Sequence, residues 1–323
     1  MTAYDVIGDI HGYAAPLEAL LGRMGYVRNG KGWRAPHGRK AVFVGDLIDR
    51  GPEQVKVVEL VRSMVDDGQA LCVLGNHEYN AIGWMTRRLG PDGKLVGEGK
   101  RADALPPEAW LKKHTERNLG NHAEFLKQVG EGSKLHKSMI KWFRTLPVAL
   151  DLGGIRVAHA WWNDTFVRRL DDRLRNGLDD TFLQAAGVKG SPEWTAMEGV
   201  TKGLEAFLPD GMTFVDHGGV VRPEVRLRWW LPKGSSWRAA AFVSDEARER
   251  LCDRTPVPDC DGFGEVEGAP VFIGHYWMDG PRTPQSSKVA CCDYSVPRSG
   301  RMVAYRWDGE GELSAANFVE SDV

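Results

Sequence analysis

The N-terminal stretch YDVI (residues 4–7), followed by GDIHG (residues 8–12), is an apolar run that ends at a glycine. Its composition predicts a buried strand, and the glycines around Asp-x-His indicate a turn. A carboxylate and an imidazole therefore follow the carboxyl end of the predicted strand. This combination is typical of a metal site.

The same arrangement occurs twice more. The apolar run AVFV (residues 41–44) leads into GDLIDRG (residues 45–51), and ALCVL (residues 70–74) leads into GNHE (residues 75–78). Three buried strands are therefore predicted to deliver polar side chains to one edge of one sheet.

Helical patterns separate these runs. Residues 14–24 carry apolar side chains three and four positions apart, which predicts one apolar helical face. After GDLIDRG, Pro52 suits a helix start and Gly68 a helix end. Four valines of this second helix are expected to face inward: Val55, Val58, Val61 and Val65. The alternation of strands and helices favours parallel strands with right-handed crossovers, so the ligands lie beyond their carboxyl ends.

The composition argues against several classes of protein. Of the 323 residues, 42% are hydrophobic and 27% are charged, which is typical of a soluble globular protein. A net charge of -2 argues against a broadly basic surface, so nucleic acid is not an expected partner. No apolar run approaches membrane-spanning length, and the first residues enter a strand without a signal peptide. We therefore expect a cytoplasmic protein without membrane partners.

The motifs GDxHG, GDxxDRG and GNHE, in this order and spacing, resemble the phosphoprotein phosphatase branch of the calcineurin-like metallophosphoesterases. The resemblance is close up to GNHE and continues later only at His159-Ala160 and Gly274-His275. It implies an α/β fold, namely a metallophosphoesterase sandwich of two mixed β-sheets flanked by helices. A single domain is expected over residues 1–323.

The resemblance also implies two divalent metal ions as cofactors. It assigns six side chains to them, with Asp46 as the bridge, Asp9 and His11 on one ion, and Asn76, His159 and His275 on the other. This mixed set of oxygen and nitrogen ligands suits manganese, which we expect first, and also iron, zinc, cobalt or nickel.

A proton donor and phosphate ligands follow from the same resemblance. His77 is expected to donate the proton to the leaving oxygen, and Asp49 to hold its imidazole and raise its pKa. Arg50 presents a planar fork that suits two phosphate oxygens. A second phosphate-binding arginine is expected between the last two metal histidines, where Arg226 and Arg228 are the candidates.

Two segments are expected to be insertions into this domain. Residues 87–144 lack the strand pattern and contain 13 Lys and Arg against 7 Asp and Glu. We favour a solvated basic helical insertion there, and the alternative is a lid whose cations attract an anionic substrate. Helices are expected at residues 107–117, 123–129 and 135–146. A second, family-specific insertion is expected at about residues 164–268.

The remaining strands lie outside these insertions. Residues 148–152 and 155–159 are predicted to form a hairpin. The alternating pattern near the end of the sequence suggests an antiparallel meander. Four closing strands are predicted at residues 270–273, 288–293, 302–307 and 313–318.

Several conspicuous residues have a structural and a functional interpretation. The pairs Trp161-Trp162 and Trp229-Trp230 either stack on a nucleobase or pack in the core, and we favour packing. The five cysteines lack CxxC spacing, so we favour neither a zinc site nor a disulfide. Asp293 and five histidines outside the motifs are expected to be structural: His37, His114, His122, His136 and His217.

Three functions are consistent with these features. The first is a metal-dependent phosphatase that cleaves phosphomonoesters by attack of metal-bound hydroxide, on phosphoserine or phosphothreonine in proteins or on a small molecule. The second is hydrolysis of a dinucleoside polyphosphate, which the tryptophan pairs and the basic insertion favour weakly. The third is a catalytically idle module that binds a phosphorylated partner, and the intact motifs argue against it. The expected partner is thus a phosphorylated protein, a small phosphorylated molecule or a nucleotide.

Overall fold

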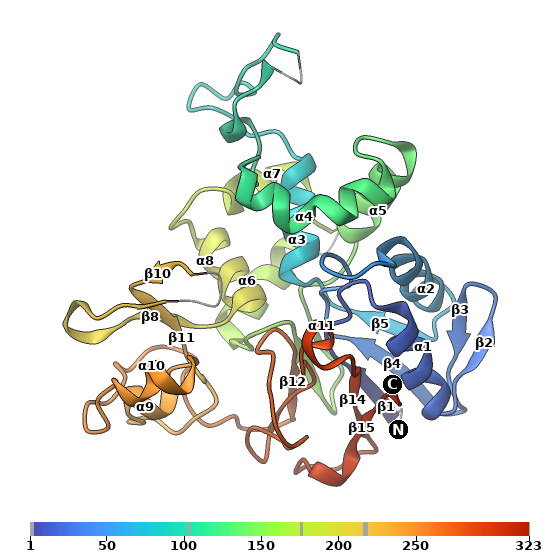
Figure 1. Ribbon diagram of the computed structural model, residues 1–323, viewed down its shortest axis with the longest axis vertical. Coiled ribbons are helices and arrows are strands. Elements are labelled where there is room, and N and C mark those ends of the chain that lie inside the picture. The colour runs from blue at the N-terminus through green and yellow to red at the C-terminus, as the bar shows by residue number, and fades with distance from the viewer. Residues whose placement is uncertain (1–2, 102–103, 175–176, 216–218, 323) are drawn as a thin grey trace.

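Two β-sheets lie at the centre of the computed structural model, which describes residues 3–101, 104–174, 177–215 and 219–322 (Figure 1). The first sheet has the strand order β15-β14-β1-β4-β5. In it, β1 (Ala3–Ile7) pairs in parallel with β4 (Arg39–Phe43), and β4 pairs in parallel with β5 (Ala70–Cys72). The three parallel strands predicted from the apolar runs are therefore confirmed.

The connection from β1 to β4 contains a helix and a small hairpin. Helix α1 (Ala14–Arg23) buries Leu17, Leu20 and Leu21, as its leucine spacing predicts. Strands β2 (Val27–Asn29) and β3 (Gly32–Arg34) then pair in antiparallel fashion.

The inward face of α2 (Gln54–Asp66) differs from the one predicted. Val58 and Val61 are buried as expected, but Val55 and Val65 are only partly buried. Positions three and four apart share one side of a helix, and here the buried stripe passes through Val57, Leu60, Val61 and Met64. Val55 and Val65 still pack against the core, as predicted, but from the edges of that stripe.

The second sheet has the strand order β13-β12-β7-β6. Strands β6 and β7 are antiparallel and form the predicted hairpin, whereas β12 pairs in parallel with both β7 and β13. Its strands are β6 (Ala149–Asp151), β7 (Arg156–Ala158), β12 (Val271–Ile273) and β13 (Val289–Cys291).

The two sheets pack face to face around a shared apolar core. Val6 and Val42 of the first sheet belong to one buried cluster with Val157 and Phe272 of the second. Ile7, the neighbour of Val6, belongs instead to the cluster that contains the helices, as the two-residue period of a strand requires. The expected sandwich of two mixed sheets flanked by helices is therefore confirmed.

The basic segment is less helical than predicted at its start. In place of a helix over residues 107–117 there is a single 3-10 turn at Pro107–Ala109. Pro106-Pro107 disfavours a helix before this point, and the Thr115 side chain accepts the N–H of Asn118 and so begins the next helix. The helices around this segment are α3 (Asn76–Met85), α4 (Glu116–Val129) and α5 (Lys134–Phe143).

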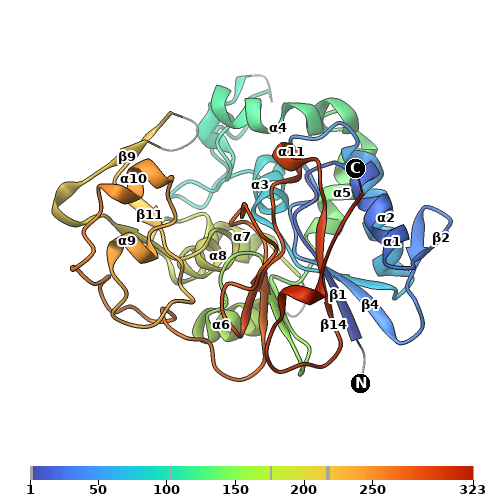
Figure 2. The same ribbon diagram turned by 60° about the horizontal axis from the view of Figure 1, so that its bottom comes forward.

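Residues 164–268 form helices and short strand pairs beside the sandwich (Figures 1 and 2). Within the described residues, their strands pair only with one another, β8 with β11 and β9 with β10. The helices are α6 (Asp164–Leu174), α7 (Asp180–Ala186), α8 (Pro192–Lys202), α9 (Trp237–Ala240) and α10 (Asp245–Glu249). The strands are β8 (Glu205–Phe207), β9 (Phe214–Val215), β10 (Val221–Arg222) and β11 (Glu224–Arg226). The division into one domain with two insertions stays a prediction.

The chain returns to the first sheet at its C-terminal end. After the short α11 (Val296–Ser299), β14 (Val303–Trp307) pairs in antiparallel fashion with β1 and with β15 (Phe318–Glu320). The strand expected over residues 313–318 is displaced, because a 3-10 turn at Ala315–Asn317 precedes β15.

All five cysteines are free thiols, and Cys72, Cys291 and Cys292 are buried. The helices of the described ranges are short or polar, and none of them has the length and apolar character needed to cross a membrane.

Candidate active site

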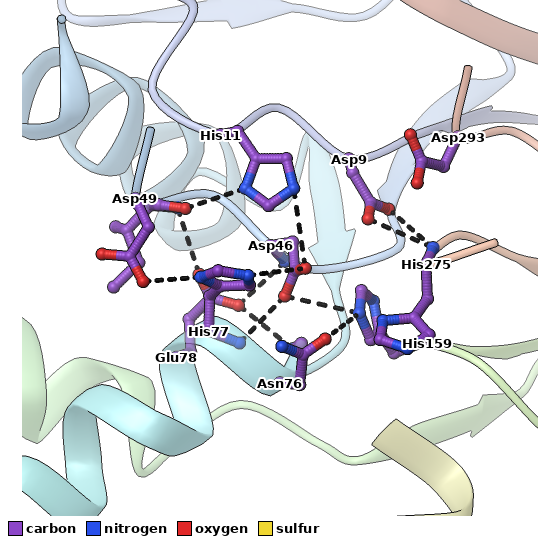
Figure 3. A network of polar contacts seen from close by, with 12 residues as sticks. Asp9, His11, Asp46, Asp49, Asn76, His77, Glu78, His159, His275 and Asp293 are labelled. Carbon is purple, nitrogen blue, oxygen red and sulfur yellow. Dashed lines mark hydrogen bonds and ion pairs between the residues drawn. The ribbon is translucent and has the colours of Figure 1, made fainter. Parts of the chain in front are cut away.

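The polar side chains predicted at the strand ends converge beyond the carboxyl ends of β1, β4, β7 and β12 (Figure 3). Five of the six predicted metal ligands are buried and His275 is partly buried. Asp46 lies between two groups of side chains in Figure 3, with His11 and His77 on one side and His159 and His275 on the other. The structure thus brings together residues that are more than 260 positions apart in sequence.

The backbone of the site is held in unusual conformations. Seven non-glycine residues among those described have a positive φ, and five of them carry predicted site side chains. Such conformations cost on the order of 1–3 kcal/mol each and persist where the surrounding structure holds them. The five are His11 (49°), Asp46 (52°), Asp49 (66°), Arg50 (79°) and His275 (63°).

Two groups of metal-binding side chains occur in the part of the chain that the structure describes. One consists of His11, Asp46 and His77 and the other of Asp46, His159 and His275, with all ligand atoms of a group within 4.8 Å of one another. Asp46 belongs to both groups, as a bridging ligand must. The first group contains His77, whereas Asp9, which was predicted to bind the same ion as His11, belongs to neither group. His77 could therefore bind a metal ion or donate a proton.

Two of the histidines are oriented by backbone carbonyls. The Nδ1 of His11 donates to the carbonyl of Ile48 at 3.0 Å, and the Nδ1 of His159 donates to the carbonyl of Val44 at 2.7 Å. This leaves the Nε2 lone pair of each ring directed toward Asp46, at 3.8 Å and 3.3 Å from its carboxylate. Burial, followed by the neighbouring His77, lowers the pKa of His11 to about 3. A neutral imidazole fixed through its other nitrogen is the usual form of a metal ligand.

Unpaired electron-pair donors around Asp46 fit a cation. The Nε2 of His159 lies 3.1 Å from the side-chain oxygen of Asn76 and 3.3 Å from Asp46 Oδ1. These three atoms converge as the ligands of a cation would. The Nε2 of His275 is buried and has no hydrogen-bond partner within the described residues. The residues present therefore fit the divalent ion that the resemblance implies.

Buried carboxylates add to this requirement for positive charge. Asp9 accepts the backbone N–H of His275 at 3.1 Å, and burial, then Asp293 and Asp46, raises its pKa well above the usual range. Asp293 accepts the backbone N–H groups of Trp277 and Ser295, at 2.9 Å and 2.8 Å. Asp293 therefore has the structural role that was expected.

Glu78 supports the site and was not assigned a role from the sequence. Its fully buried carboxylate accepts backbone N–H groups from Gly75, Asp46 and Leu47, at 3.1, 2.9 and 2.8 Å. Burial, followed by the nearby Asp46 charge, raises its pKa to about 7. The signal was present in GNHE, since a glutamate three positions after a helix N-cap is typical of a capping box.

His77 and Asp49 interact as predicted, but a third residue joins them. The Nδ1 of His77 donates to Asp49 Oδ2 at 2.5 Å, and the Nδ1 of His122 donates to Asp49 Oδ1 at 2.7 Å. Burial alone would raise the pKa of Asp49, but the two imidazoles hold it at about 2. Asp46 and Asp49 raise the pKa of His77 against the effect of burial. His122 was expected to be a structural residue rather than a ligand, and its contact with Asp49 was not predicted.

The other four histidines expected to be structural have various surroundings. His114 stacks between the rings of Trp84 and Trp110, at centroid distances of 3.7 Å and 4.6 Å. His136 accepts the backbone N–H of Gly132 through Nδ1. Neither of these two belongs to a metal-binding group within the described residues. His37 is exposed, and His217 lies outside the described residues.

The three candidate arginines have different surroundings. Arg50 is exposed and lines the pocket described below. Arg226 donates to the carbonyl of Lys202 at 2.7 Å and lies near His275, whose pKa is held well below its usual range by burial first and then by this arginine. Arg228 donates to the carbonyls of Ala239 and Ala241, so its guanidinium has a structural role. Arg226 stays the candidate for the second phosphate ligand.

The tryptophan pairs pack in the core. All four side chains are buried, with exposed fractions between 1% and 7%. Trp229 Nε1 donates to the carbonyl of Ala160 at 3.0 Å, and Trp161 Nε1 donates to the carbonyl of Gly262 at 3.1 Å. Their indole faces are therefore not available to a nucleobase, and the favoured packing interpretation is confirmed.

A pocket of about 420 Å³ adjoins His77 and Arg50. It extends between α3 and α4, so the segment from residue 87 to residue 144 supplies one wall. This position favours a substrate-contacting role for the segment over a merely solvated one. The residues lining it are Asp49, Arg50, Asn76, His77, Asn80, Trp84, Lys112, Asn118, Gly120, Asn121, His122 and Glu124.

Comparisons with known proteins support the expected family. The relatives include a bis(5'-nucleosyl)-tetraphosphatase PrpE (asymmetrical) from Geobacillus thermodenitrificans, 30% identical over 58% of this chain and 66% of the relative. The same enzyme from Anoxybacillus flavithermus is 46% identical over 23% of this chain and 30% of the relative. The matches therefore span about two thirds or less of these relatives' lengths.

Among solved structures, a protein serine/threonine phosphatase from Saccharomyces cerevisiae with similarity to human PP5 is 13% identical. It aligns with a TM-score of 0.49 over 99% of this chain and 79% of that chain. The sequence model of the calcineurin-like phosphoesterase family matches residues 4–197 of the present chain, which is more than half of its length. The protein belongs to the calcineurin-like phosphoesterase family.

Proposed function

We propose that the protein is a dinuclear-metal-dependent hydrolase that cleaves dinucleoside polyphosphates, with asymmetrical cleavage of a tetraphosphate as its reaction. The observation that carries the proposal is the polar pocket that begins at His77 and Arg50 and extends between α3 and α4. A polyphosphate substrate extends beyond the reacting phosphoryl group, so its enzyme needs a pocket that continues from the reaction site and holds the rest of the chain. The names of the Geobacillus and Anoxybacillus relatives support the same reaction.

The metal site of this proposal uses the six predicted ligands. Asp46 would contact both ions, in agreement with its membership of both metal-binding groups. When bound, the two ions supply a nucleophile from water and neutralise charge on the phosphoryl oxygens. Manganese is the ion that we propose first for this ligand set: Asp9, His11, Asp46, Asn76, His159 and His275.

The protein's own residues position the substrate and move a proton. His77 holds a proton on Nδ1 through Asp49, and its Nε2 faces the site, 3.8 Å from Asp46. In its protonated form, His77 donates the Nε2 proton to the leaving oxygen. Arg50, exposed at the pocket mouth, binds two oxygens of the reacting phosphoryl group, and Arg226 approaches from the side of His275.

The proposed reaction consumes one water molecule. The water oxygen forms a bond to phosphorus while the bond from phosphorus to the leaving phosphate oxygen breaks. The leaving oxygen takes the proton from His77, and a proton of the water is released to solvent and later restores His77. The products of asymmetrical cleavage are a nucleoside triphosphate and a nucleoside monophosphate.

A phosphomonoesterase is the second candidate, because its chemistry needs the same residues. It was the first expectation from the sequence, with phosphoserine, phosphothreonine or a small phosphorylated molecule as substrate. The names of the relatives favour the dinucleotide instead. An idle binding module would need a damaged site, whereas here His77 contacts Asp49 beside two groups of candidate metal ligands that share Asp46.

The test is a comparison of substrates with the metal-reconstituted protein. We expect kcat/KM to be highest for a dinucleoside tetraphosphate, lower for p-nitrophenyl phosphate and bis-p-nitrophenyl phosphate, and lowest for a phosphoserine peptide. Chromatography should show triphosphate and monophosphate products in equal amounts. A preference for the phosphopeptide, or two diphosphate products, would overturn the proposal.

A further inference from the structure

One wall of the pocket contains a cation without a partner. The backbone N–H of Lys112 donates to the carbonyl of Gly83 at 3.0 Å, which fixes this residue against α3. Its ammonium has no hydrogen-bond or ion-pair partner within the described ranges, since the nearby Glu198 is paired with Lys202. Burial, followed by the charge of Lys202, lowers the pKa of Lys112 to about 8. Lys112 is partly buried, and an anion placed beside a partly buried cation without a direct counter-ion would be stabilised.

The groups around Lys112 suit a bound phosphate rather than a bound cation, which would need several carboxylate ligands. The side chains of Asn80 and Asn121 line the pocket and have no hydrogen-bond partners within the described residues. The one carboxylate that faces the pocket without an imidazole partner, Glu124, accepts from Gln128 Nε2 at 2.8 Å. Amide N–H groups beside an ammonium are typical ligands of phosphate oxygens.

The position of the pocket relative to His77 identifies the part of the substrate that would enter it. A proton donor must contact the leaving oxygen. Groups attached to that oxygen then continue past His77, and the pocket that His77 lines leads to Lys112. A serine or phenol leaving group carries no phosphate to meet Lys112, whereas a polyphosphate leaving group carries several negatively charged phosphates.

We propose that Lys112, with Asn80 and Asn121, forms a second anion subsite that binds the phosphates of a polyphosphate leaving group. This inference rests on the proposed function, because it concerns the substrate class of the same site. The subsite would select phosphoanhydride chains over phosphomonoesters. The basic segment would thereby determine specificity, while the strand-end motifs supply the chemistry.

The first experiment compares Lys112→Met with Lys112→Arg and with Lys113→Met, in which the neighbouring lysine is exposed and lies outside the pocket. We expect Lys112→Met to lower kcat/KM for a dinucleoside tetraphosphate by about tenfold or more, since charge-assisted contacts to phosphate are strong. The loss on p-nitrophenyl phosphate should be under about twofold. Lys112→Arg should restore much of the activity, and Lys113→Met should resemble the wild type.

Equal losses on the two substrates in Lys112→Met, or no loss on either, would overturn the subsite. A folding defect would appear as equal losses together with a lowered Tm in Lys112→Met but not in Lys112→Arg. In that case the Lys112→Arg variant tests the proposal. If the subsite exists, this variant must keep the wild-type preference for the tetraphosphate over p-nitrophenyl phosphate.

A second measurement separates the subsite from the proposed function. Methylenebisphosphonate and orthophosphate are compared as inhibitors of p-nitrophenyl phosphate hydrolysis at a fixed free metal concentration. The wild type should bind the bisphosphonate more tightly, and Lys112→Met should reduce this preference about tenfold. If the wild type does not cleave the tetraphosphate but shows this preference, the proposed function fails and the subsite stands. An unchanged preference in Lys112→Met removes the subsite.

Discussion

Residues 3–85 and residues 87–144 contribute to the same pocket in different ways. The first region supplies buried strand ends, a strained backbone and most of the polar side chains beside Asp46. The second supplies α4 and the loop before it, with Lys112 and His122 directed toward the groups of the first region. The candidate catalytic residues belong to short motifs that follow strands. The residues around the leaving group come instead from a segment that contains no recognisable motif.

This difference separates residues that affect the reaction itself from residues that affect which substrate is used. Changes at the metal ligands and at Arg50 should affect every substrate, because all share the phosphoryl group, whereas changes at His77 and Asp49 should depend on how basic the leaving oxygen is. Changes in the second region should depend on the leaving group, because α4 and its loop line the pocket beyond His77. Substitutions at four positions sharpen or break this contrast.

The largest effect is expected at Asp46. Because its carboxylate belongs to both metal-binding groups, Asp46→Asn should lower kcat by at least about 10³-fold on all substrates, since several kcal/mol of charge stabilisation are lost. It should also reduce bound metal, measured by elemental analysis, more than His11→Asn does. Two full equivalents of metal in Asp46→Asn would contradict the bridging role.

His77 comes next. General acid catalysis contributes about 10²- to 10⁴-fold, and its contribution grows with the basicity of the leaving oxygen. His77→Asn should therefore retain both metal equivalents and lose most activity on an alkyl phosphate, but much less on p-nitrophenyl phosphate. Asp49→Asn should show the same dependence in weaker form, whereas Arg50→Ala should slow all substrates. Missing metal in His77→Asn would instead make His77 a ligand, in agreement with its membership of one metal-binding group.

A substitution at His122 tests whether residues 87–144 affect the chemical step. His122→Phe removes the donor to Asp49 Oδ1 but keeps a ring against Phe125. Asp49 would then orient His77 less firmly, so we expect about a tenfold loss of kcat on an alkyl phosphate and a smaller one on p-nitrophenyl phosphate. The variant His136→Phe serves as a control, because His136 makes no contact with Asp49. A uniform loss in both variants would show that His122 only supports packing.

The smallest effect concerns pH. Lys112 is protonated below its pKa of about 8 and neutral above it, so its attraction for phosphate is present below pH 8 and is lost as the pH rises through that value. Lys202, Glu198, Asp49 and Arg117 surround it from α8, the loop after β4 and α4. The KM for a tetraphosphate should rise severalfold between pH 7 and pH 9 in the wild type. The ratio of KM in Lys112→Met to KM in the wild type should fall over the same interval, and a constant ratio would exclude Lys112 titration as the cause.

The sequence predicted the first region well because its signals are local. A glycine-bounded carboxylate or imidazole directly follows an apolar run, and the strands that result are parallel. Glycine is required there by space as well, since a Cβ at Gly75 would lie 2.3 Å from Asp46 Oδ1. A pattern of this kind can be recognised without knowing the rest of the fold.

The second region could not be predicted in the same way. His122 and its partner Asp49 are 73 positions apart, and neither the helical pattern of α4 nor its charge shows that one face meets Asp49. Lys112 resembles Lys113 in sequence, yet only Lys112 lines the pocket. The expected helix over residues 107–117 failed because two prolines and the cap at Thr115 outweigh the local apolar spacing. Long-range packing determined the positions of His122 and Lys112, whereas the failed helix shows that local stop and start signals were underweighted.

The pairing of β1 with β14 has a consequence for synthesis of the chain. β1 forms near the N-terminus, but one of its edges is covered only by residues 303–307, and Asp9 meets His275 across 266 positions. During translation, β1 therefore presents an unpaired edge until residues 303–307 have left the ribosome. Contacts of such separation slow folding and expose strand edges to other chains. A chain shortened before residue 303 would retain the motifs that identify the family and yet be prone to aggregate.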